Sequence, residues 1–138
     1  MIVQLIRQAA ILLGIAALPA LVSGAIQLTW RHQEPLAADE VLPKTAESWG
    51  DTALFVDARP RARFNEKHIP GALLLNLDEW DGLVGKFLDA WDPDKKIVVY
   101  CDGGGCDAAR DVASRMGKDL QLKNVYVLKG GWPAWESR

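Results

Sequence analysis

Cysteine and histidine are scarce in this chain of 138 residues, which contains two of each. Two thiols are too few for a disulfide-stapled framework, and Cys101 and Cys106 lie so close together that they indicate chemistry more than architecture. Glycines surround them, whereas core residues would surround a pair of buried structural thiols. The two histidines, His32 and His68, are far apart and do not form a paired metal-ligand spacing, so the sequence indicates no metal site.

Basic residues are not in excess either, because the formal net charge is −2. A chain without a basic surface does not indicate nucleic-acid binding. Acidic residues are absent from residues 1–32, where the charged side chains are Arg7 and Arg31. All acidic residues and most basic ones follow, so the remainder carries a net charge of −4 and is not attracted to anionic lipid.

Residues 9–30 contain no charged side chain over 22 residues, which is long enough for an apolar helix to cross a bilayer core. Arg7 and Arg31 flank this segment, and Trp30 suits an interfacial aromatic position. We therefore predict that residues 1–32 are a transmembrane anchor or a signal segment, and that the chain meets the membrane through residues 9–30.

The two alternatives place the rest of the chain differently. An uncleaved anchor would hold the domain at the membrane, outside the cytoplasm and on the periplasmic side in a bacterium. A signal peptide would be cleaved near Ala25, where small residues suit a signal peptidase, and would release a secreted or periplasmic protein. In either case, residues 33–46 are predicted as a linker and domain entry, and residues 47–138 as the domain.

Short apolar runs alternate with helical patterns in the predicted domain. The runs that predict strands are residues 53–57, 73–77, 97–100 and 125–128. Helices are predicted for residues 62–67, 79–88 and 109–120. Asp78 is a suitable N-cap for the second helix. This alternation predicts an α/β fold, with a small parallel sheet covered by helices on both faces.

Cys101 stands at the carboxyl end of the strongest predicted strand, which is where ligands bind in open α/β sheets. The loop that it opens leads into a helix, and its predicted anion-binding residues are Asp102, Gly103, Gly104, Gly105, Cys106 and Asp107. Helix N-termini favour anions, and the glycines let several N–H groups point at one spot. We therefore expect a lowered pKa for the Cys101 thiol, and a loop that holds a thiolate, a persulfide or an oxyanion.

Three separated motifs resemble those of the rhodanese-like family, over roughly residues 40 to 138. The first is Val56-Asp57-Ala58-Arg59 with Phe64, followed by His68-Ile69-Pro70-Gly71-Ala72, with Lys67 where the family usually has glycine. The second is Val99-Tyr100-Cys101 with its glycine loop. The third runs from Asn124 to Trp132 and resembles the closing strand and the glycine-tryptophan end of the family pattern.

The resemblance implies a sulfurtransferase with Cys101 as its catalytic residue. The cysteine would accept a sulfane sulfur from a small donor and pass it to a thiophilic acceptor such as cyanide or a thiol, without a cofactor or a metal. We expect Asp57 and Arg59 to bind each other or nearby backbone. His68 is expected to be a structural turn residue, and Trp132 to border the site.

The loop departs from the family pattern at Asp102, because many members place a cation there or within the next few positions. Arg110 follows only on the predicted helix. Thiosulfate is doubly anionic and would meet Asp102 at a cost on the order of a kcal/mol, so the donor is left unassigned. Asp107 stands where related cysteine phosphatases have the arginine that binds phosphate, which argues against phosphatase or arsenate reductase action.

Cys106 leaves a second function open. It could attack a persulfide or a sulfenate on Cys101 and close a disulfide, which would make the domain a thiol-disulfide redox module. A third alternative is a non-catalytic module that binds or delivers sulfur for a membrane protein partner.

Overall fold

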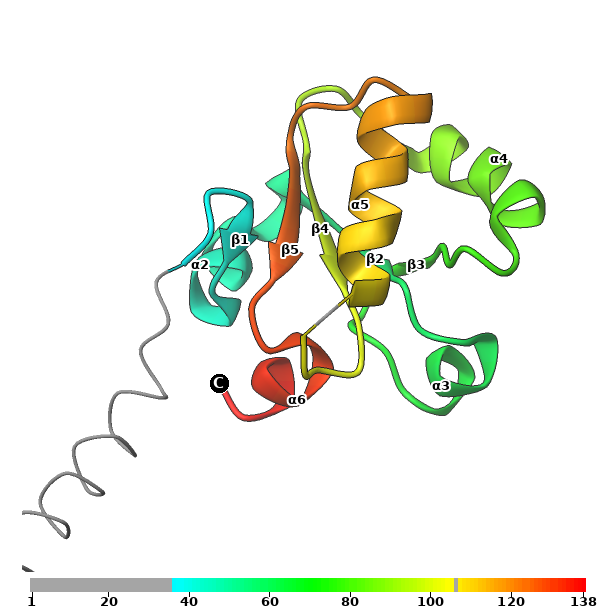
Figure 1. Ribbon diagram of the computed structural model, residues 1–138. Helices are drawn as coiled ribbons and strands as arrows, with labels where there is room; N and C mark the ends of the chain where they lie inside the picture. The colour runs from blue at the N-terminus through cyan, green and yellow to red at the C-terminus, as the bar shows by residue number, and fades with distance from the viewer. Residues whose placement is uncertain (1–35, 106) are drawn as a thin grey trace, which may run out of the picture. The chain divides into compact units, whose positions relative to one another are not determined.

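The computed structural model of the protein describes residues 36–105 and 107–138. Residues 36–138 belong to one structural unit (Figure 1). The predicted membrane segment, residues 9–30, lies outside the described residues. Among the residues that are described, no helix has the length and apolar character needed to cross a membrane.

Five parallel strands form one sheet in the order β1-β5-β4-β2-β3. The strands are β1 (Glu40–Val41), β2 (Ala53–Asp57), β3 (Leu73–Leu74), β4 (Lys96–Tyr100) and β5 (Val125–Leu128). The helices are α2 (Pro43–Ser48), α3 (Arg61–Glu66), α4 (Trp80–Ala90), α5 (Asp107–Asp119) and α6 (Gly131–Glu136), with a 3-10 turn at Gly50–Thr52. The predicted α/β fold with a small parallel sheet is confirmed.

Strand β4 lies at the centre of the sheet, and its side chains alternate between two cores. Ile97 and Val99 pack in the core that α4 and α5 cover, whereas Val98 and Tyr100 pack in the core that α2 and α6 cover. Helices therefore lie on both faces, as predicted (Figure 1). Because side chains alternate with a period of two, Cys101 continues the first series and joins the core beneath α5.

Helix α4 begins differently from the prediction that Asp78 is its N-cap. The helix starts at Trp80, and Glu79 holds the cap position without a side-chain cap bond. The side chain of Asn76 instead accepts a hydrogen bond from the N–H of Glu79 at 2.8 Å. Strand β3 is also shorter than predicted and ends at Leu74, because the chain turns at Asn76, whose buried amide donates to the carbonyl of Arg59 at 3.2 Å.

Strand β1 and the start of α2 lie in the described part of the segment predicted as a linker and domain entry. The N–H of Val127 donates to the carbonyl of Asp39 at 2.7 Å, and the N–H of Lys129 to that of Val41 at 2.9 Å. Pro43 starts α2, where its missing N–H costs no helical hydrogen bond. These contacts attach the first described residues to the edge of the sheet beside β5.

Candidate active site

Cys101 directly follows β4, at the edge where the carboxyl ends of the parallel strands meet. Its side chain is buried, with 5 % of its surface exposed. The main-chain N–H of Gly103 points at Sγ, and the nitrogen–sulfur distance is 3.5 Å. An N–H donor in this position favours a thiolate, while the carbonyl oxygen of Gly103, 3.8 Å from Sγ, accepts a hydrogen bond from the neutral thiol.

Two glycine-rich segments approach each other at this loop. Gly103 and Gly104 adopt positive φ angles of 104° and 69°, which bend the chain after the cysteine. Gly131 approaches from the other segment, and a Cβ built on it would lie 2.5 Å from the carbonyl oxygen of Cys101. The N–H of Trp132 donates to the same oxygen at 2.7 Å. The closing motif of the sequence therefore holds the cysteine loop in place.

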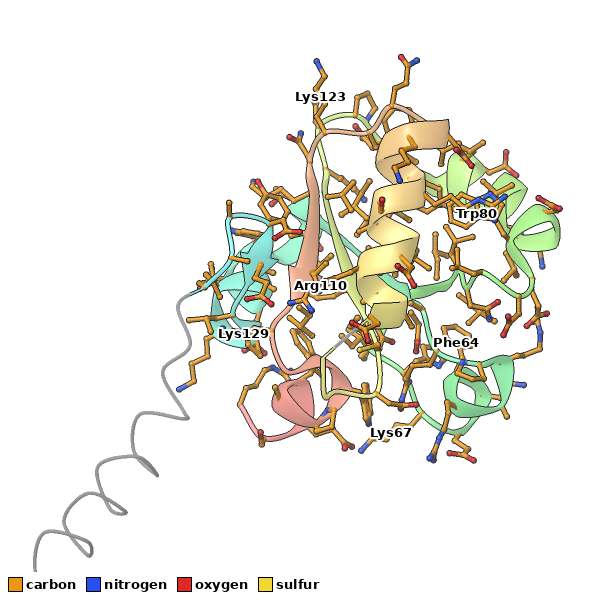
Figure 2. The ribbon with its side chains drawn as sticks, in the orientation of Figure 1. Phe64, Lys67, Trp80, Arg110, Lys123 and Lys129 are labelled. Carbon is orange, nitrogen blue, oxygen red and sulfur yellow. The ribbon has the colours of Figure 1, made fainter. Side chains whose placement is uncertain are left out.

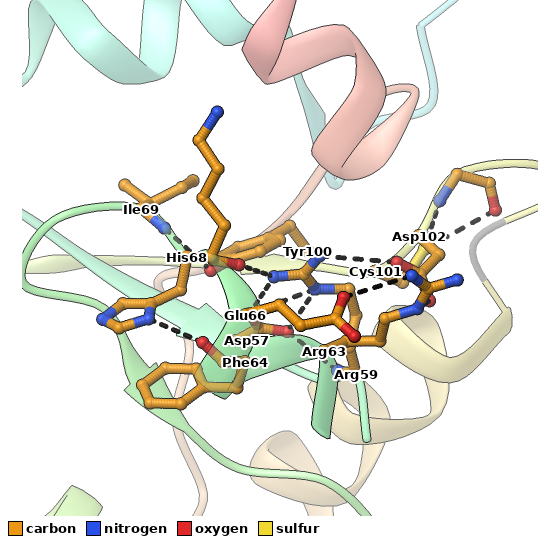
Figure 3. A network of polar contacts seen from close by, with 12 residues as sticks. Asp57, Arg59, Arg63, Phe64, Glu66, His68, Ile69, Tyr100, Cys101 and Asp102 are labelled. Carbon is orange, nitrogen blue, oxygen red and sulfur yellow. Dashed lines mark hydrogen bonds and ion pairs between the residues drawn. The ribbon is translucent and has the colours of Figure 1, made fainter. Parts of the chain in front are cut away.

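A buried ion pair lies under the site, where Arg59 is 4 % and Asp57 0 % exposed. Nε of Arg59 donates to Oδ1 of Asp57 at 3.0 Å and Nη2 to Oδ2 at 2.7 Å, which forms a bidentate pair (Figure 3). Nη2 also donates to the carbonyl of Lys67 at 2.7 Å. Burial acts to lower the pKa of Arg59, but the hydrogen bonds and charge of Asp57 outweigh it and raise that pKa above its usual range. The expected pairing of these two residues is confirmed.

Aromatic rings flank the guanidinium group of Arg59. Its central carbon lies 4.7 Å from the ring centroid of Trp132 and 5.4 Å from that of Tyr100. Burial raises the pKa of the Tyr100 hydroxyl well above its usual range, and the nearby Asp57 carboxylate raises it further. Tyr100 therefore stays a neutral phenol, and its oxygen accepts a hydrogen bond from the N–H of Ile69 at 3.2 Å.

An open hollow of about 310 Å³ lies over the ion pair. Its lining residues are Arg59, Arg63, Glu66, Lys67, Asp102, Trp132 and Pro133. Asp102 is about half exposed, and its carboxylate faces Arg59 at 3.4 Å and Arg63 at 4.0 Å. The loop itself lacks a cation, as its sequence shows, but two guanidinium groups from another segment lie beside Asp102. Segment 59–67 brings cations to the loop across the sheet edge.

The other predicted site residues lie around this arrangement. The ring of His68 stacks on Phe64 with 3.9 Å between ring centroids, and Nδ1 lies 2.8 Å from the carbonyl oxygen of Phe64, so the ring packs on the segment that precedes it. Arg110, labelled in Figure 2, donates to the carbonyl of Gly105 and, at 2.6 Å, to the Glu40 carboxylate of β1. It ties the loop to the edge strand and does not line the hollow.

The far end of the predicted loop is described only in part. Asp107 is the first residue of α5. Cys106 lies outside the described residues, and its role as a resolving thiol stays a prediction.

Sequence reasoning missed Arg63, Glu66 and Lys67, which line the hollow together with Arg59. A signal for the cations was present, because Arg59, Arg63 and Lys67 recur every four residues in and around α3. Their approach to Asp102 depends on the pairing of β2 with β4, which the sequence of either segment alone does not contain.

The class of the domain follows from this arrangement, a parallel α/β sheet whose central strand is followed directly by a cysteine and a glycine loop. The rhodanese-like domain family matches residues 37–138, and the chain belongs to this family.

Two curated sulfurtransferases are similar in sequence. The chain is 33 % identical over 127 residues to the 3-mercaptopyruvate sulfurtransferase of Escherichia coli K12, with 75 % of this chain and 43 % of that protein covered. It is 31 % identical over 98 residues to the thiosulfate sulfurtransferase GlpE of Glaesserella parasuis, with 70 % and 84 % covered. The chain thus spans less than half the length of the first relative and most of the second.

Solved structures show the same fold. A protein of Bacillus halodurans superposes with a TM-score of 0.61 at 20 % identity, covering 86 % of this chain and 81 % of that one. A thiosulfate sulfurtransferase of Pseudomonas aeruginosa superposes with a TM-score of 0.54 at 25 % identity, covering 75 % of this chain and 19 % of that one.

Proposed function

We propose that this domain is a sulfurtransferase that carries a sulfane sulfur as a persulfide on Cys101. The observation that carries the proposal is the N–H of Gly103 directed at Sγ of Cys101, in a loop at the carboxyl end of β4. Such a donor stabilises a thiolate before transfer and a persulfide anion after it. The sulfurtransferase names of two relatives support the same chemistry.

Atoms and electrons balance in the proposed sulfur transfer without a cofactor. The Cys101 thiolate attacks the outer sulfur of the donor, a new S–S bond forms, and the donor's own bond to that sulfur breaks. The donor leaves with the bonding electron pair, as sulfite from thiosulfate or as a thiolate from a persulfide. A thiol or cyanide acceptor then attacks the terminal sulfur and restores the Cys101 thiolate.

Intact mass measurement tests this proposal on the full chain in detergent. Separate incubations with thiosulfate and with polysulfide are compared for the wild type and Cys101→Ser. A gain of one sulfur atom with either donor in the wild type, absent in Cys101→Ser, is the expected result. Failure of both donors to add sulfur contradicts the proposal and favours a non-catalytic sulfur-binding module.

The same spectra address the redox alternative. Loss of two hydrogens without a sulfur gain would indicate a disulfide between Cys101 and Cys106. Cys106→Ser is the matched variant, and we expect it to load sulfur as the wild type does. Loss of loading in this variant would make Cys106 part of the transfer.

We further propose that residues 9–30 tether the domain to a membrane with the domain outside the cytoplasm, where a membrane protein could supply or accept sulfur. The support is the uncharged run of 22 residues in the sequence. Alkaline phosphatase fused after Arg138 should be active in a bacterial host, and inactivity contradicts this orientation. The mass of the mature chain distinguishes a retained anchor from cleavage near Ala25.

A further inference from the structure

Asp102 connects the cysteine loop to two arginines of a distant segment. Its Oδ1 lies 3.4 Å from Nη1 of Arg59, and its Oδ2 lies 4.0 Å from Nε of Arg63 (Figure 3). Each carboxylate oxygen therefore faces a different guanidinium group. A carboxylate in this position occupies the place that an anionic ligand would take between the two cations.

Two of the three guanidinium nitrogens of Arg59 already hydrogen-bond other groups. Nε faces Asp57, and Nη2 donates to Asp57 and to the carbonyl of Lys67. Nη1 is the nitrogen that faces Asp102. An anion that enters the hollow and binds Arg59 through Nη1 therefore competes with the Asp102 carboxylate.

The remaining cations of the hollow also face carboxylates. Nη1 of Arg63 lies 3.3 Å from Glu66, and Nζ of Lys67 lies 2.7 Å from Glu136. Each cation of the hollow is therefore paired with at least one carboxylate. Its floor includes the ring of Trp132, over which Arg59 lies, and Pro133 adds apolar surface.

We propose that Asp102 is a specificity determinant, an internal anion that excludes small dianionic donors and favours sulfane sulfur carried on an organic thiol. This inference rests on the proposed sulfur transfer through Cys101. Thiosulfate brings two charges on a small ion, and Asp102 both repels it and occupies the guanidinium groups that would bind it. A thiol persulfide has its reacting charge on the sulfur itself and an organic body, to which Trp132 and Pro133 offer apolar surface.

Rates of persulfide formation on Cys101 test the proposal, measured by intact mass with thiosulfate and with cysteine persulfide as probes. For Asp102→Asn in the full chain, we expect a rate increase of about tenfold with thiosulfate and less than about threefold with cysteine persulfide. Asp89→Asn, an exposed residue of α4, removes the same charge away from the hollow and should change neither rate.

A second variant tests the freed guanidinium group itself. Adding Arg63→Gln to Asp102→Asn should remove most of the gain with thiosulfate, because the gain requires a cation to bind the dianion. An unchanged donor preference in Asp102→Asn overturns the inference while leaving sulfur transfer intact. Absence of sulfur on the wild type with both probes would instead contradict the proposed function, so the two failures are distinguishable.

Discussion

The carbonyl oxygen of Cys101 and the main-chain N–H of Trp132 form a hydrogen bond of 2.7 Å, which joins the reactive loop to the last helix of the domain. The contact is main chain to main chain, so it does not depend on the tryptophan ring. It depends on the residue before it, because Gly131 lies too close to the loop for any side chain. The position of the sulfur is therefore set by a segment about thirty residues further along the sequence.

Gly131→Ala should displace the cysteine loop. The added Cβ would lie 2.5 Å from the Cys101 carbonyl oxygen and 2.8 Å from the nitrogen of Gly103, at a φ of +59°. Misplacement of a reacting group by about 1 Å can cost on the order of a hundredfold, so persulfide formation should fall by about that factor.

Gly71→Ala is the matched control for this change. Gly71 has a φ of +79°, but nothing lies within 4 Å of its added Cβ, so strain of about 1 kcal/mol in unfolding free energy is the expected cost. Equal loss of persulfide formation in the two variants would show that the contact of Gly131 with the loop is unimportant.

Breaking the buried pair of Asp57 and Arg59 should destabilise the fold strongly. Arg59→Met leaves a fully buried carboxylate without its partner, which typically costs about 3–5 kcal/mol in unfolding free energy. Urea denaturation measures this. Arg61→Gln removes an exposed pair with Glu79, which solvent screens, and should cost much less. Similar losses in both variants would contradict a structural role for the buried pair.

Arg110 should act on sulfur transfer by positioning the loop. Arg110→Gln removes its hydrogen bond to the Gly105 carbonyl and its contact with Glu40, and both are near the surface. We expect persulfide formation to slow several-fold, while unfolding free energy changes by at most about 1 kcal/mol. Arg115→Gln, further along the same helix, should leave the rate of persulfide formation unchanged. Equal rates of persulfide formation in the two variants would show that Arg110 does not position the cysteine loop.

Glu40 should stabilise the domain in a pH-dependent manner. A hydrogen bond from the N–H of Ala37 lowers the pKa of its carboxyl below the ordinary value of 4.5, and Lys129 and Arg110 lower it further. A carboxyl whose folded pKa is depressed adds stability above its unfolded pKa, and this contribution is lost as pH falls through the folded pKa.

Urea denaturation of the wild type and Glu40→Gln, from neutral pH to about pH 3, measures that contribution. The two should differ at neutral pH, with the wild type more stable, and the difference should shrink once the pH falls below 4.5. A difference that stays constant over the whole range would mean that the Glu40 charge does not stabilise the fold.

The sequence predicts the strands and helices that carry a strong local signal, because β4 is a continuous apolar run rich in β-branched residues and α5 repeats apolar residues at helical spacing. It does not predict β1 or α6. A strand of two residues has no measurable period, and Pro133 within a six-residue helix resembles a turn. Both elements form because β5 and the cysteine loop provide partners for them.

The residues of the candidate site also include some that the sequence predicts and some that it does not. Cys101 and its glycines could be identified because a strand, a cysteine, glycines and a helix follow one another in the sequence. The surroundings of Asp102 could not be, since Arg59 and Arg63 reach it through the pairing of β2 with β4. Which strands lie side by side in a parallel sheet is a property of the tertiary structure, and local sequence patterns do not reveal it.

The hydrogen bond between Trp132 and the cysteine loop also determines when the site can form during synthesis. During synthesis, Cys101 is made about thirty residues before Trp132, and before β5, with which β1 pairs. At about 5–20 residues per second, a few seconds separate the synthesis of these two residues. The geometry of the cysteine loop therefore arrives late, as a property that the chain gains only when its closing segment has been added.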